Sequence, residues 1–423
     1  MSAEIITFGC RLNAADSQAM RALAGERDAV IVNTCAVTAE AVAEARKAIR
    51  RARRDRPDAP IYVTGCAAQI EPQNFAAMPE VTRVIGNAEK FDATSFLPGE
   101  SARVRVADIM AVRANAPHLV PAFADKVRAF VEVQTGCDHR CTFCIIPYGR
   151  GNSRSAPAGL VIDRIRTLVD AGHQEVVLTG VDITSYGHDL PGAPSLGQLA
   201  ARILTHVPEL PRLRLSSVDP IEIDEQMLEL IAHEPRIMPH LHLSLQAGDD
   251  MILKRMKRRH SRADAIALCQ RLRALRPEIA FGADIIAGFP TESEEMFANS
   301  LAMIEACDIV FGHIFPYSER AGTPAARMPQ VPVPVRKARA AALRAAAAQR
   351  HERWLQSLVG TRDTLLVERH DGSGHGRAFA PIRAAGTQRR DLLDVTITGV
   401  EDGRLTAAPI PTPQADRKLH ELA

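Results

Sequence analysis

Short apolar runs alternate with helix-length stretches through most of this 423-residue chain. In the first part of the chain the apolar runs have the length and the character of buried parallel strands. They cover residues 4–8, 28–33 and 60–64, and the helical stretches between them cover 14–25 and 37–55. This α/β alternation predicts an open, Rossmann-like parallel sheet, which we assign to an N-terminal domain at residues 1–118.

The same alternation recurs in the middle of the chain. The strand-like runs there cover residues 127–134, 175–180, 212–217, 240–246, 280–287 and 309–315. Helical stretches lie between most of them, at residues 157–171, 196–205, 222–233, 261–275 and 292–305. Six strand–helix units predict a partial (β/α)6 barrel rather than the closed eight-fold barrel, in a central domain at residues 123–357. The Ala-rich stretch 336–357 has high helix propensity and would link this domain to the next.

The pattern changes near residue 358, where strand-like runs alternate with turns that contain Gly and Asp. The runs cover residues 363–368, 376–383, 391–400 and 404–410. They predict a small all-β barrel, which forms a C-terminal domain at residues 358–413. The fold class expected for the whole chain is therefore α/β with an added all-β domain.

Composition narrows the class of protein. Hydrophobic residues make up 46% of the chain and charged residues 24%, which is ordinary globular composition. The 52 basic and 50 acidic residues nearly cancel, so net charge neither favours nor excludes a nucleic-acid partner. No apolar run is long enough to span a membrane, and the start, MSAEIITFGC, lacks the pattern of a secretory signal. We expect a cytoplasmic protein with no membrane partner. Among its eight cysteines, those that cluster are expected to be metal ligands or catalytic groups.

Three cysteines cluster in the segment GCDHRCTFC, at Cys137, Cys141 and Cys144. Zinc ribbons use paired C-x-x-C units with four ligands, and ferredoxin-type sites use four thiolates. Three thiolates in one loop can instead hold three irons of a [4Fe–4S] cluster and leave the fourth iron open. The alternative interpretations are a structural zinc site and a chance grouping of cysteines.

With the aromatic Phe143 before its third cysteine, this loop resembles the signature of radical S-adenosylmethionine (SAM) enzymes. The resemblance implies that the open iron chelates SAM, and that one electron cleaves SAM to methionine and a 5′-deoxyadenosyl radical. It also implies an electron donor of the flavodoxin or ferredoxin type. Candidates for holding SAM are Phe143 and residues at the ends of the predicted strands, namely Thr179, Gly180, Ser216, Ser217, Gln246, Asp284, Ile286 and Gly288.

Each of the first three cysteines, Cys10, Cys35 and Cys66, comes just after a predicted strand. The carboxyl ends of neighbouring parallel strands converge on one crevice, so these residues are expected to meet there. We infer a second [4Fe–4S] cluster with its own open iron, although free Cys is also a common small core residue. Cys269 and Cys307 have no partners at ligand spacing, and we interpret both as structural.

Three cysteines in an N-terminal α/β domain, followed by a radical-type barrel, resemble the methylthiotransferase family. The blocks that carry the resemblance are Gly9–Asn13, Asn33–Thr38, Gly65–Cys66, Cys137–Tyr148, Gly180–Gly187, Ser216–Pro220, Leu243–Asp249, Asp284–Pro290 and Tyr317–Pro324. The C-terminal domain resembles the TRAM barrel of tRNA-modifying enzymes. In the family, the block that corresponds to Gly9–Asn13 is usually followed by Gln, an aromatic residue and Glu. This chain has Ala14, Ala15 and Asp16 there, so only the contacts that those three positions would make are in question.

The segment after Cys144, IIPYGRGNSRS, resembles the branch that acts on tRNA carrying N(6)-threonylcarbamoyladenosine next to the anticodon (position 37). The resemblance implies that the C-2 carbon of this base is methylthiolated, with sulfur presented by the second cluster. Two SAM molecules are then used per turnover, one for the radical and one for the methyl group. The alternatives are a methylthiotransferase for isopentenyladenosine in tRNA or for a ribosomal-protein aspartate, and, more remotely, a non-catalytic iron–sulfur redox protein.

Basic residues in three places are candidates for binding the tRNA substrate. The first place follows the cysteine loop, the second follows the fourth barrel strand, and the third lies in the C-terminal barrel. The candidates are Arg150, Arg154, Lys254, Arg258, Arg259, Arg383, Arg389 and Arg390. A further basic run at residues 46–56 competes for this role, and basic runs on helices are also often simple solvated faces.

Overall fold

The computed structural model describes residues 3–97, 102–113 and 127–411. The described chain separates into two compact units, Met1–Arg350 and His351–Ala423. The boundary predicted between residues 118 and 123 lies outside the described residues.

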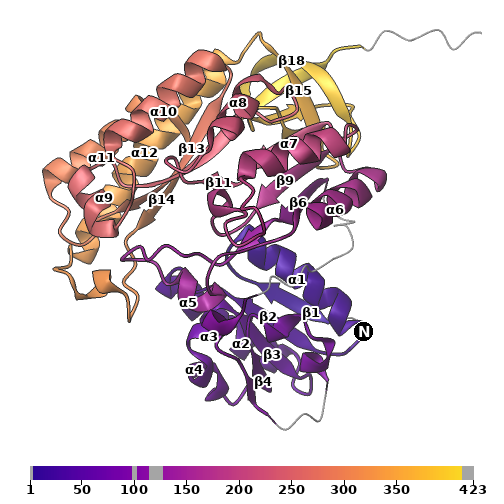
Figure 1. Cartoon of the computed structure of the whole chain (residues 1–423), viewed down its shortest axis with the longest axis vertical. Helices are drawn as coiled ribbons and strands as arrows, with labels where there is room; N and C mark the ends of the chain where they lie inside the picture. Colours follow the sequence, from indigo (N-terminus) through magenta and orange to yellow (C-terminus); the bar gives the residue numbers. More distant parts are fainter. Residues whose placement is uncertain (1–2, 98–101, 114–126, 412–423) are drawn as a thin grey trace, which may run out of the picture. The chain divides into compact units, whose positions relative to one another are not determined.

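A parallel sheet forms the N-terminal part of the first unit, as predicted (Figure 1). Its order is β1 (Glu4–Thr7), β2 (Val30–Thr34), β3 (Ile61–Gly65), β4 (Arg83–Ile85) and β5 (Val104–Arg105). The first two crossovers are α1 (Arg11–Ala24) and α2 (Ala39–Asp55). Sequence patterns missed β4 and β5, because strands of three and two residues are too short to show a regular pattern of apolar and polar residues. Short helices α3 (Cys66–Ile70) and α4 (Pro72–Ala76) follow β3.

Alternation along the strands gives this sheet a core on each face. Val32 and Val63 point to one face and pack in a cluster with Ile49 of α2. Their neighbours Ile31 and Tyr62 point to the other face, with Met20 of α1 and Phe96. Both faces are therefore covered, which explains why the strands read as continuous apolar runs.

The rest of the first unit is an open series of parallel strands, as expected for a partial barrel (Figure 1). Its strands are β6 (Arg128–Glu132), β9 (Glu175–Thr179), β10 (Arg212–Leu215), β11 (Ser217–Val218), β12 (His240–Gln246), β13 (Ala280–Ala287) and β14 (Ile309–Pro316). β10 and β11 occupy one strand position that is interrupted at Ser216. The small antiparallel pair β7 (Gln134–Thr135) and β8 (Arg154–Ser155) brackets the cysteine loop.

Helices cover the outside of the barrel strands. They are α6 (Ala158–Asp170), α7 (Leu196–His206), α8 (Glu225–His233), α9 (Asp250–Met256), α10 (Arg262–Leu275) and α11 (Glu294–Ala306), with the short α5 (Ile146–Arg150) after the cysteine loop. Capping boxes headed by Ser195 and Ser261 set the starts of α7 and α10. The sequence pattern missed α9, which is only two turns long.

The barrel interior is polar, because strand alternation sends apolar side chains outward. In β12, Leu241, Leu243 and Leu245 are buried in the core beneath the helices. His242 and Gln246 point the other way and keep partial exposure. A polar lumen of this kind suits a site for a charged ligand, not a packed core.

The second unit contains a small closed barrel, which confirms the predicted C-terminal all-β barrel. The domain bounds 358–413 stay a prediction. Its strands, in barrel order, are β15 (Arg362–Val367), β16 (Ser373–His375), β17 (Pro381–Ala384), β19 (Arg404–Pro409) and β18 (Leu392–Glu401). The long helix α12 (Val333–Ser357) carries the chain from the first unit into the second. Among the described residues, no helix is both long and apolar enough to cross a membrane.

Candidate functional site

The central cysteine loop follows β6 and β7 at the carboxyl end of the first barrel strand. Gly136 precedes Cys137 with a φ of 72°, and a Cβ there would lie 1.9 Å from the Asn152 carbonyl oxygen, so only glycine fits. The Cys144 amide donates to the Cys141 carbonyl oxygen at 3.0 Å and closes a turn between them. The thiols of all three loop cysteines are free.

These thiols act on one another electrostatically. Burial is the main cause that raises the pKa of Cys144 to about 12, and the neighbouring Cys141 raises it further. Burial also raises the pKa of Cys137, with further contributions from Asp182 and from the other two cysteines. Three converging thiols without disulfide partners fit a cluster held by three thiolates, because bound iron offsets their negative charge.

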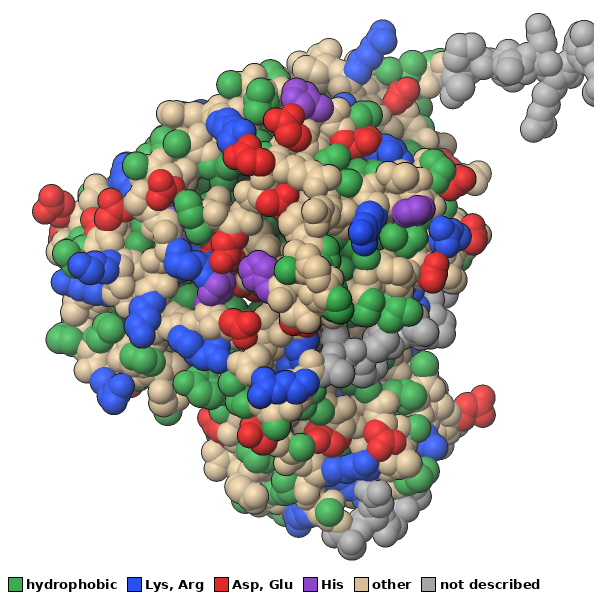
Figure 2. Space-filling view, in the orientation of Figure 1, with side chains coloured by type: hydrophobic (Ala, Val, Ile, Leu, Met, Phe, Trp, Pro, Cys, Tyr) green, Lys and Arg blue, Asp and Glu red, His purple; other side chains and the backbone are tan. Residues whose placement is uncertain are grey.

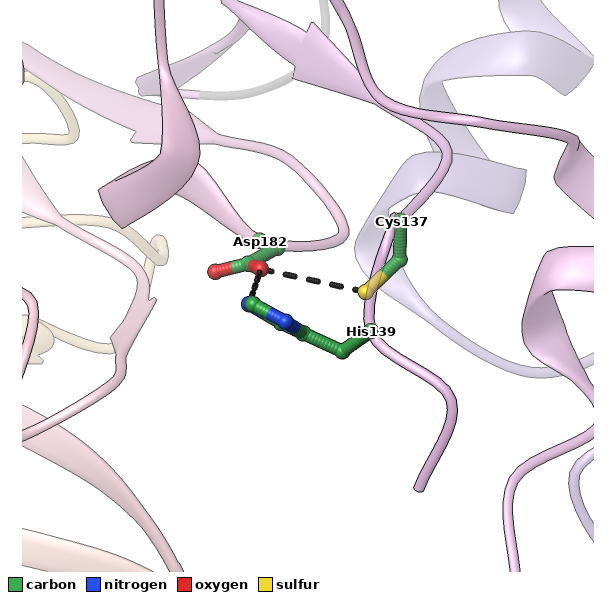
Figure 3. Close-up of side chains that lie close together, drawn as sticks. All are labelled: Cys137, His139 and Asp182. Atoms are coloured by element: carbon green, nitrogen blue, oxygen red, sulfur yellow. Dashed lines mark hydrogen bonds and ion pairs between the residues drawn. The ribbon is translucent and has the colours of Figure 1, made fainter. Parts of the chain in front are cut away.

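Charged side chains lie around Cys137, the first cysteine of the loop. Figure 3 shows the Asp182 carboxylate directed at both the His139 ring and the Cys137 thiol. The Nε2–Oδ2 distance is 2.9 Å and the Sγ–Oδ2 distance is 3.8 Å. Hydrogen bonds from His139 to Asp182 and Glu222 raise the pKa of the imidazole to about 9. His139 therefore carries positive charge beside the loop at neutral pH, a role that the sequence pattern did not reveal.

The basic segment after α9 lies against the same loop. The Arg258 side chain is only 7% exposed, donates to Asp219 at 2.8 Å and lies 3.7 Å from the Cys141 thiol. Arg259 pairs with the same Asp219. Lys254 on α9 is exposed. We predicted that all three would contact RNA, but the structure gives Arg258 buried protein partners and a place beside the cluster loop.

The three N-terminal cysteines come together at the carboxyl edge of their sheet. Cys10 lies three residues after the end of β1, and Cys35 and Cys66 directly follow β2 and β3. The first two turns touch, because a Cβ on Gly9 would lie 2.7 Å from the Cys35 sulfur. Burial raises the pKa of Cys35 to about 11, and the charges of Cys66 and Cys10 raise it further. Like the central loop, this group offers three free thiols at one place and so fits a second metal centre.

The two groups of cysteines face each other within the first unit. Gly149 in α5, just past the central loop, packs on Cys66 so closely that a Cβ there would lie 3.0 Å from the Cys66 Cβ. Asn87 joins the same point, since its amide donates to the Gly149 carbonyl oxygen at 2.6 Å and lies 3.8 Å from the Cys66 sulfur. The charge of Cys66 also raises the pKa of Cys144.

A buried ion network sits between the two groups. Asp16 accepts from Lys90 at 2.6 Å and from Arg150 at 2.7 Å, and Arg150 also donates to Asn13 at 2.7 Å. Burial alone would raise the pKa of Asp16, but the two cations lower it. We expected Arg150 and Arg154 to bind RNA. Both side chains are buried and bonded to protein groups. Arg150 joins the segment after the central loop to the N-terminal domain, whereas Arg154 bonds the carbonyl oxygens of Asn152 and Arg150. Their contact with RNA stays a prediction.

The SAM candidates occupy the carboxyl ends of successive strands, as the predicted barrel requires. Thr179 ends β9, Ser216 interrupts β10 and β11, and Gln246 ends β12 with a φ of 68°. Ser217 begins β11, and Ile286 lies in β13. Gly180 lies against Gln134, and Gly288 packs on Arg336. Phe143 makes an edge-to-face contact with Phe289. The Ser216 hydroxyl is buried without a hydrogen-bond partner among the described residues. The role of these residues in binding SAM stays a prediction.

The remaining basic candidates lie in the second unit. Arg383 is exposed on β17, and Arg390 is exposed with a φ of 82°. Arg389 donates to the Glu368 carbonyl oxygen at 3.2 Å. Their contact with RNA likewise stays a prediction.

Asp284, one of the SAM candidates, has two histidine partners that the sequence analysis did not find. His242 and His313 both reach Asp284 Oδ1, at 3.1 Å from Nε2 and 3.3 Å from Nδ1 respectively. Burial would raise the pKa of Asp284, but the two imidazoles lower it well below its usual range. The alternation in HLHLSLQ was the available signal for His242, because it places this residue on the same face as Gln246.

Comparisons with known proteins agree with this arrangement. Residues 131–304 match the radical SAM superfamily, and residues 2–86 match the uncharacterized protein family UPF0004. The radical SAM methyltransferase TsrM from Kitasatospora setae shares the fold, with a TM-score of 0.51 and 20% identity over 75% of this chain and 67% of that chain. The barrel and its three-cysteine loop thus define a radical SAM enzyme.

Two curated relatives narrow the assignment. Threonylcarbamoyladenosine tRNA methylthiotransferase MtaB of Rickettsia prowazekii is 50% identical over 95% of this chain and 96% of its own length. A tRNA-2-methylthio-N(6)-dimethylallyladenosine synthase of Cereibacter sphaeroides is 34% identical over 93% of this chain and 95% of its own length. The chain belongs to the tRNA methylthiotransferase family.

Proposed function

We propose that this protein methylthiolates the C-2 carbon of N(6)-threonylcarbamoyladenosine next to the anticodon (position 37) in tRNA. The observation that best supports this proposal is that the two groups of three cysteines lie next to each other, where Gly149 packs on Cys66. The branch is supported by similarity, since identity is 50% to the threonylcarbamoyladenosine enzyme and 34% to the dimethylallyladenosine enzyme. Both relatives match nearly the full length of the chain.

Cys137, Cys141 and Cys144 are the residues that would hold the first [4Fe–4S] cluster. When bound, such a cluster with an open iron supplies the electron that cleaves SAM to a deoxyadenosyl radical. The chain's own contribution is to fix the loop. Gly136 allows its sharp entry, and His139 and Arg258 place positive charge beside the thiolates.

Cys10, Cys35 and Cys66 would hold a second cluster, which supplies the sulfur. We propose two SAM molecules per turnover, one for the radical and one for the methyl group. A carbon radical must be trapped before it reacts elsewhere, so sulfur and radical source need one enclosed site. The network of Asp16, Lys90 and Arg150 holds the two groups of cysteines in that relation.

The proposal includes a reductant of the flavodoxin or ferredoxin type and a cytoplasmic location. Both follow from the chemistry, because the clusters need low-potential electrons and the substrate is tRNA.

The deciding experiment is mass spectrometry of nucleosides digested from total tRNA of the source organism, with and without this gene. We expect the methylthio form of threonylcarbamoyladenosine to vanish and its precursor to accumulate. Loss of methylthio-isopentenyladenosine instead would contradict the branch. If no tRNA nucleoside changes, the substrate is not tRNA, and a ribosomal-protein aspartate becomes the first alternative to examine.

A further inference from the structure

Arg11 is a cation without a partner beside the second group of cysteines. It is the first residue of α1 and directly follows Cys10. Its side chain is exposed, and its guanidinium has no hydrogen bond or ion pair within the described parts of the chain. The guanidinium lies over the Phe130 ring in a cation–π contact, with the Arg11 Cζ 5.6 Å from the ring centroid.

The backbone that carries Arg11 is fixed. The Asn13 amide donates to the carbonyl oxygens of Phe8 at 2.8 Å and Thr34 at 3.0 Å, so the turn between β1 and α1 is bonded to itself and to β2. The side-chain amide oxygen Oδ1 of Asn13 in turn accepts from Arg150. Arg11 therefore extends from a rigid base, which lowers the entropy lost when its guanidinium binds a ligand.

The guanidinium points from the N-terminal sheet into the barrel lumen. Phe130 lies on the inward side of β6, because Ala129 and Val131 beside it are buried in the outer core. Although the Arg11 side chain is accessible to solvent, surrounding protein atoms partly desolvate it, which is the first cause that lowers its pKa; Arg128 and Arg214 lower it further, while Glu175 and Asp284 raise it. All four of these charged residues belong to barrel strands.

The acids near Arg11 are already neutralised by other groups. Glu175 bonds to Arg214 at 2.8 Å, and Asp284 is bonded by His242 and His313. His313 is 71% exposed, and the bond to Asp284 raises its pKa. The lumen thus presents Arg11 and a histidine pair with few unused negative charges.

A metal ion is a poor match for this place. His242, Asp284 and His313 do lie close enough to bind one. However, the charge of Arg11 already acts on both Asp284 and His313, and a second fixed cation there would be repelled. The lumen therefore suits an anion, and a guanidinium prefers a carboxylate or phosphate that it can bind through two parallel hydrogen bonds.

The proposed substrate carries one such anion at a suitable place. The threonylcarbamoyl group is attached to N6 of adenine, on the ring edge that also holds N1 and C-2. Because Arg11 directly follows Cys10, a base whose C-2 is directed at the cysteines would present this same edge, with its N6 substituent, toward Arg11. We propose that Arg11 is a specificity-determining residue that binds the threonine carboxylate, with the His242–Asp284–His313 group lining the same pocket. This inference rests on the proposed function.

The test measures kcat/KM for methylthiolation of two anticodon stem–loop RNAs. One carries threonylcarbamoyladenosine, and the other carries its neutral methyl amide. We expect kcat/KM of the wild-type protein to be about 10- to 100-fold higher for the RNA with the carboxylate. Arg11→Gln should remove this preference by lowering kcat/KM for that RNA alone. Arg11→Lys should restore part of it. The matched control is Arg21→Gln, which removes an exposed arginine from the other end of α1 and should change neither value.

Release of 5′-deoxyadenosine from SAM with a chemical reductant and no RNA serves as the folding check, and Arg11→Gln should retain it. Equal slowing of both RNAs by Arg11→Gln would overturn the inference, and so would unchanged kinetics. Failure of the proposed function would look different, because wild-type protein would then methylthiolate neither RNA.

Discussion

The two groups of three cysteines are built in opposite ways. The central group lies within eight residues, and its geometry is set locally by a glycine turn and by the Cys144–Cys141 hydrogen bond. The N-terminal group draws Cys10, Cys35 and Cys66 from three separate strand ends, so its geometry depends on the sheet. A local motif can be recognised from spacing alone. A site built by topology can be recognised only when the strands that carry it are predicted first.

The structure also shows that the two groups are not independent. Asp16 follows the first N-terminal cysteine and Arg150 follows the central loop, and the two form a buried ion pair. Figure 2 shows acidic, basic and histidine side chains gathered in the middle of this face of the molecule. Charge therefore positions the two groups, while apolar packing forms the separate cores behind them.

The largest effect should come from removing cysteines of one group at a time. Cys141→Ala should abolish formation of 5′-deoxyadenosine, because the loop can no longer hold its cluster. Cys35→Ala should leave SAM cleavage largely intact and stop methylthiolation. Both products are measured by liquid chromatography and mass spectrometry. If the two variants behaved alike, with both still cleaving SAM, the division of roles between the two groups would be wrong.

A smaller effect should follow from breaking the link between the groups. Asp16→Ala leaves Lys90 and Arg150 buried without their acid, which should cost about 3–5 kcal/mol of unfolding free energy. The control is Asp92→Ala, since an exposed pair such as Asp92–Arg105 is screened by solvent and should contribute little. Urea unfolding measures both. Equal stability of the two variants would show that the buried network contributes nothing to joining the domains.

The smallest effect concerns acid stability of the barrel alone. Burial raises the pKa of Glu175, but Arg214 and its neighbours lower it to about 2 in the folded protein. Stabilisation by Glu175 is therefore complete above the ordinary carboxyl pKa and is lost as pH falls toward 2. Between pH 6 and pH 4 we expect a loss of about 1 kcal/mol from this group.

Urea unfolding of the metal-free full chain at the two pH values would measure this loss. Glu175→Gln, which cannot titrate, should lose correspondingly less between them. An equal loss in both proteins would assign the acid sensitivity to other carboxylates.

Sequence patterns predicted the strands and helices well where elements were long. They also located the six cysteines proposed as ligands at strand ends or in one loop, where the structure has them. They failed for side chains that meet across long separations. Nothing near Arg150 in the sequence indicates that its partner is Asp16, and basic residues at Arg150, Arg154 and Arg258 were interpreted as RNA contacts for that reason.

The two remaining cysteines illustrate the same limit. Cys269 in α10 and Cys307 after α11 have no ligand spacing, and both are buried. The structure nevertheless brings their thiols into hydrogen-bond contact, which raises the pKa of Cys269 and lowers that of Cys307. Helix packing rather than local sequence decides this contact, so spacing alone could not reveal it.

The Asp16–Arg150 pair has a consequence for how this architecture can be recombined. The two residues lie on opposite sides of the expected boundary near residue 118. Exchanging one half leaves Arg150 buried without its acid, while Asp16 keeps only Lys90 as a partner. A chimera that takes its N-terminal sheet from one relative and its barrel from another must therefore inherit a compatible acid and arginine together. Because the pair joins both halves of the compact unit Met1–Arg350, that unit is the segment to transfer whole.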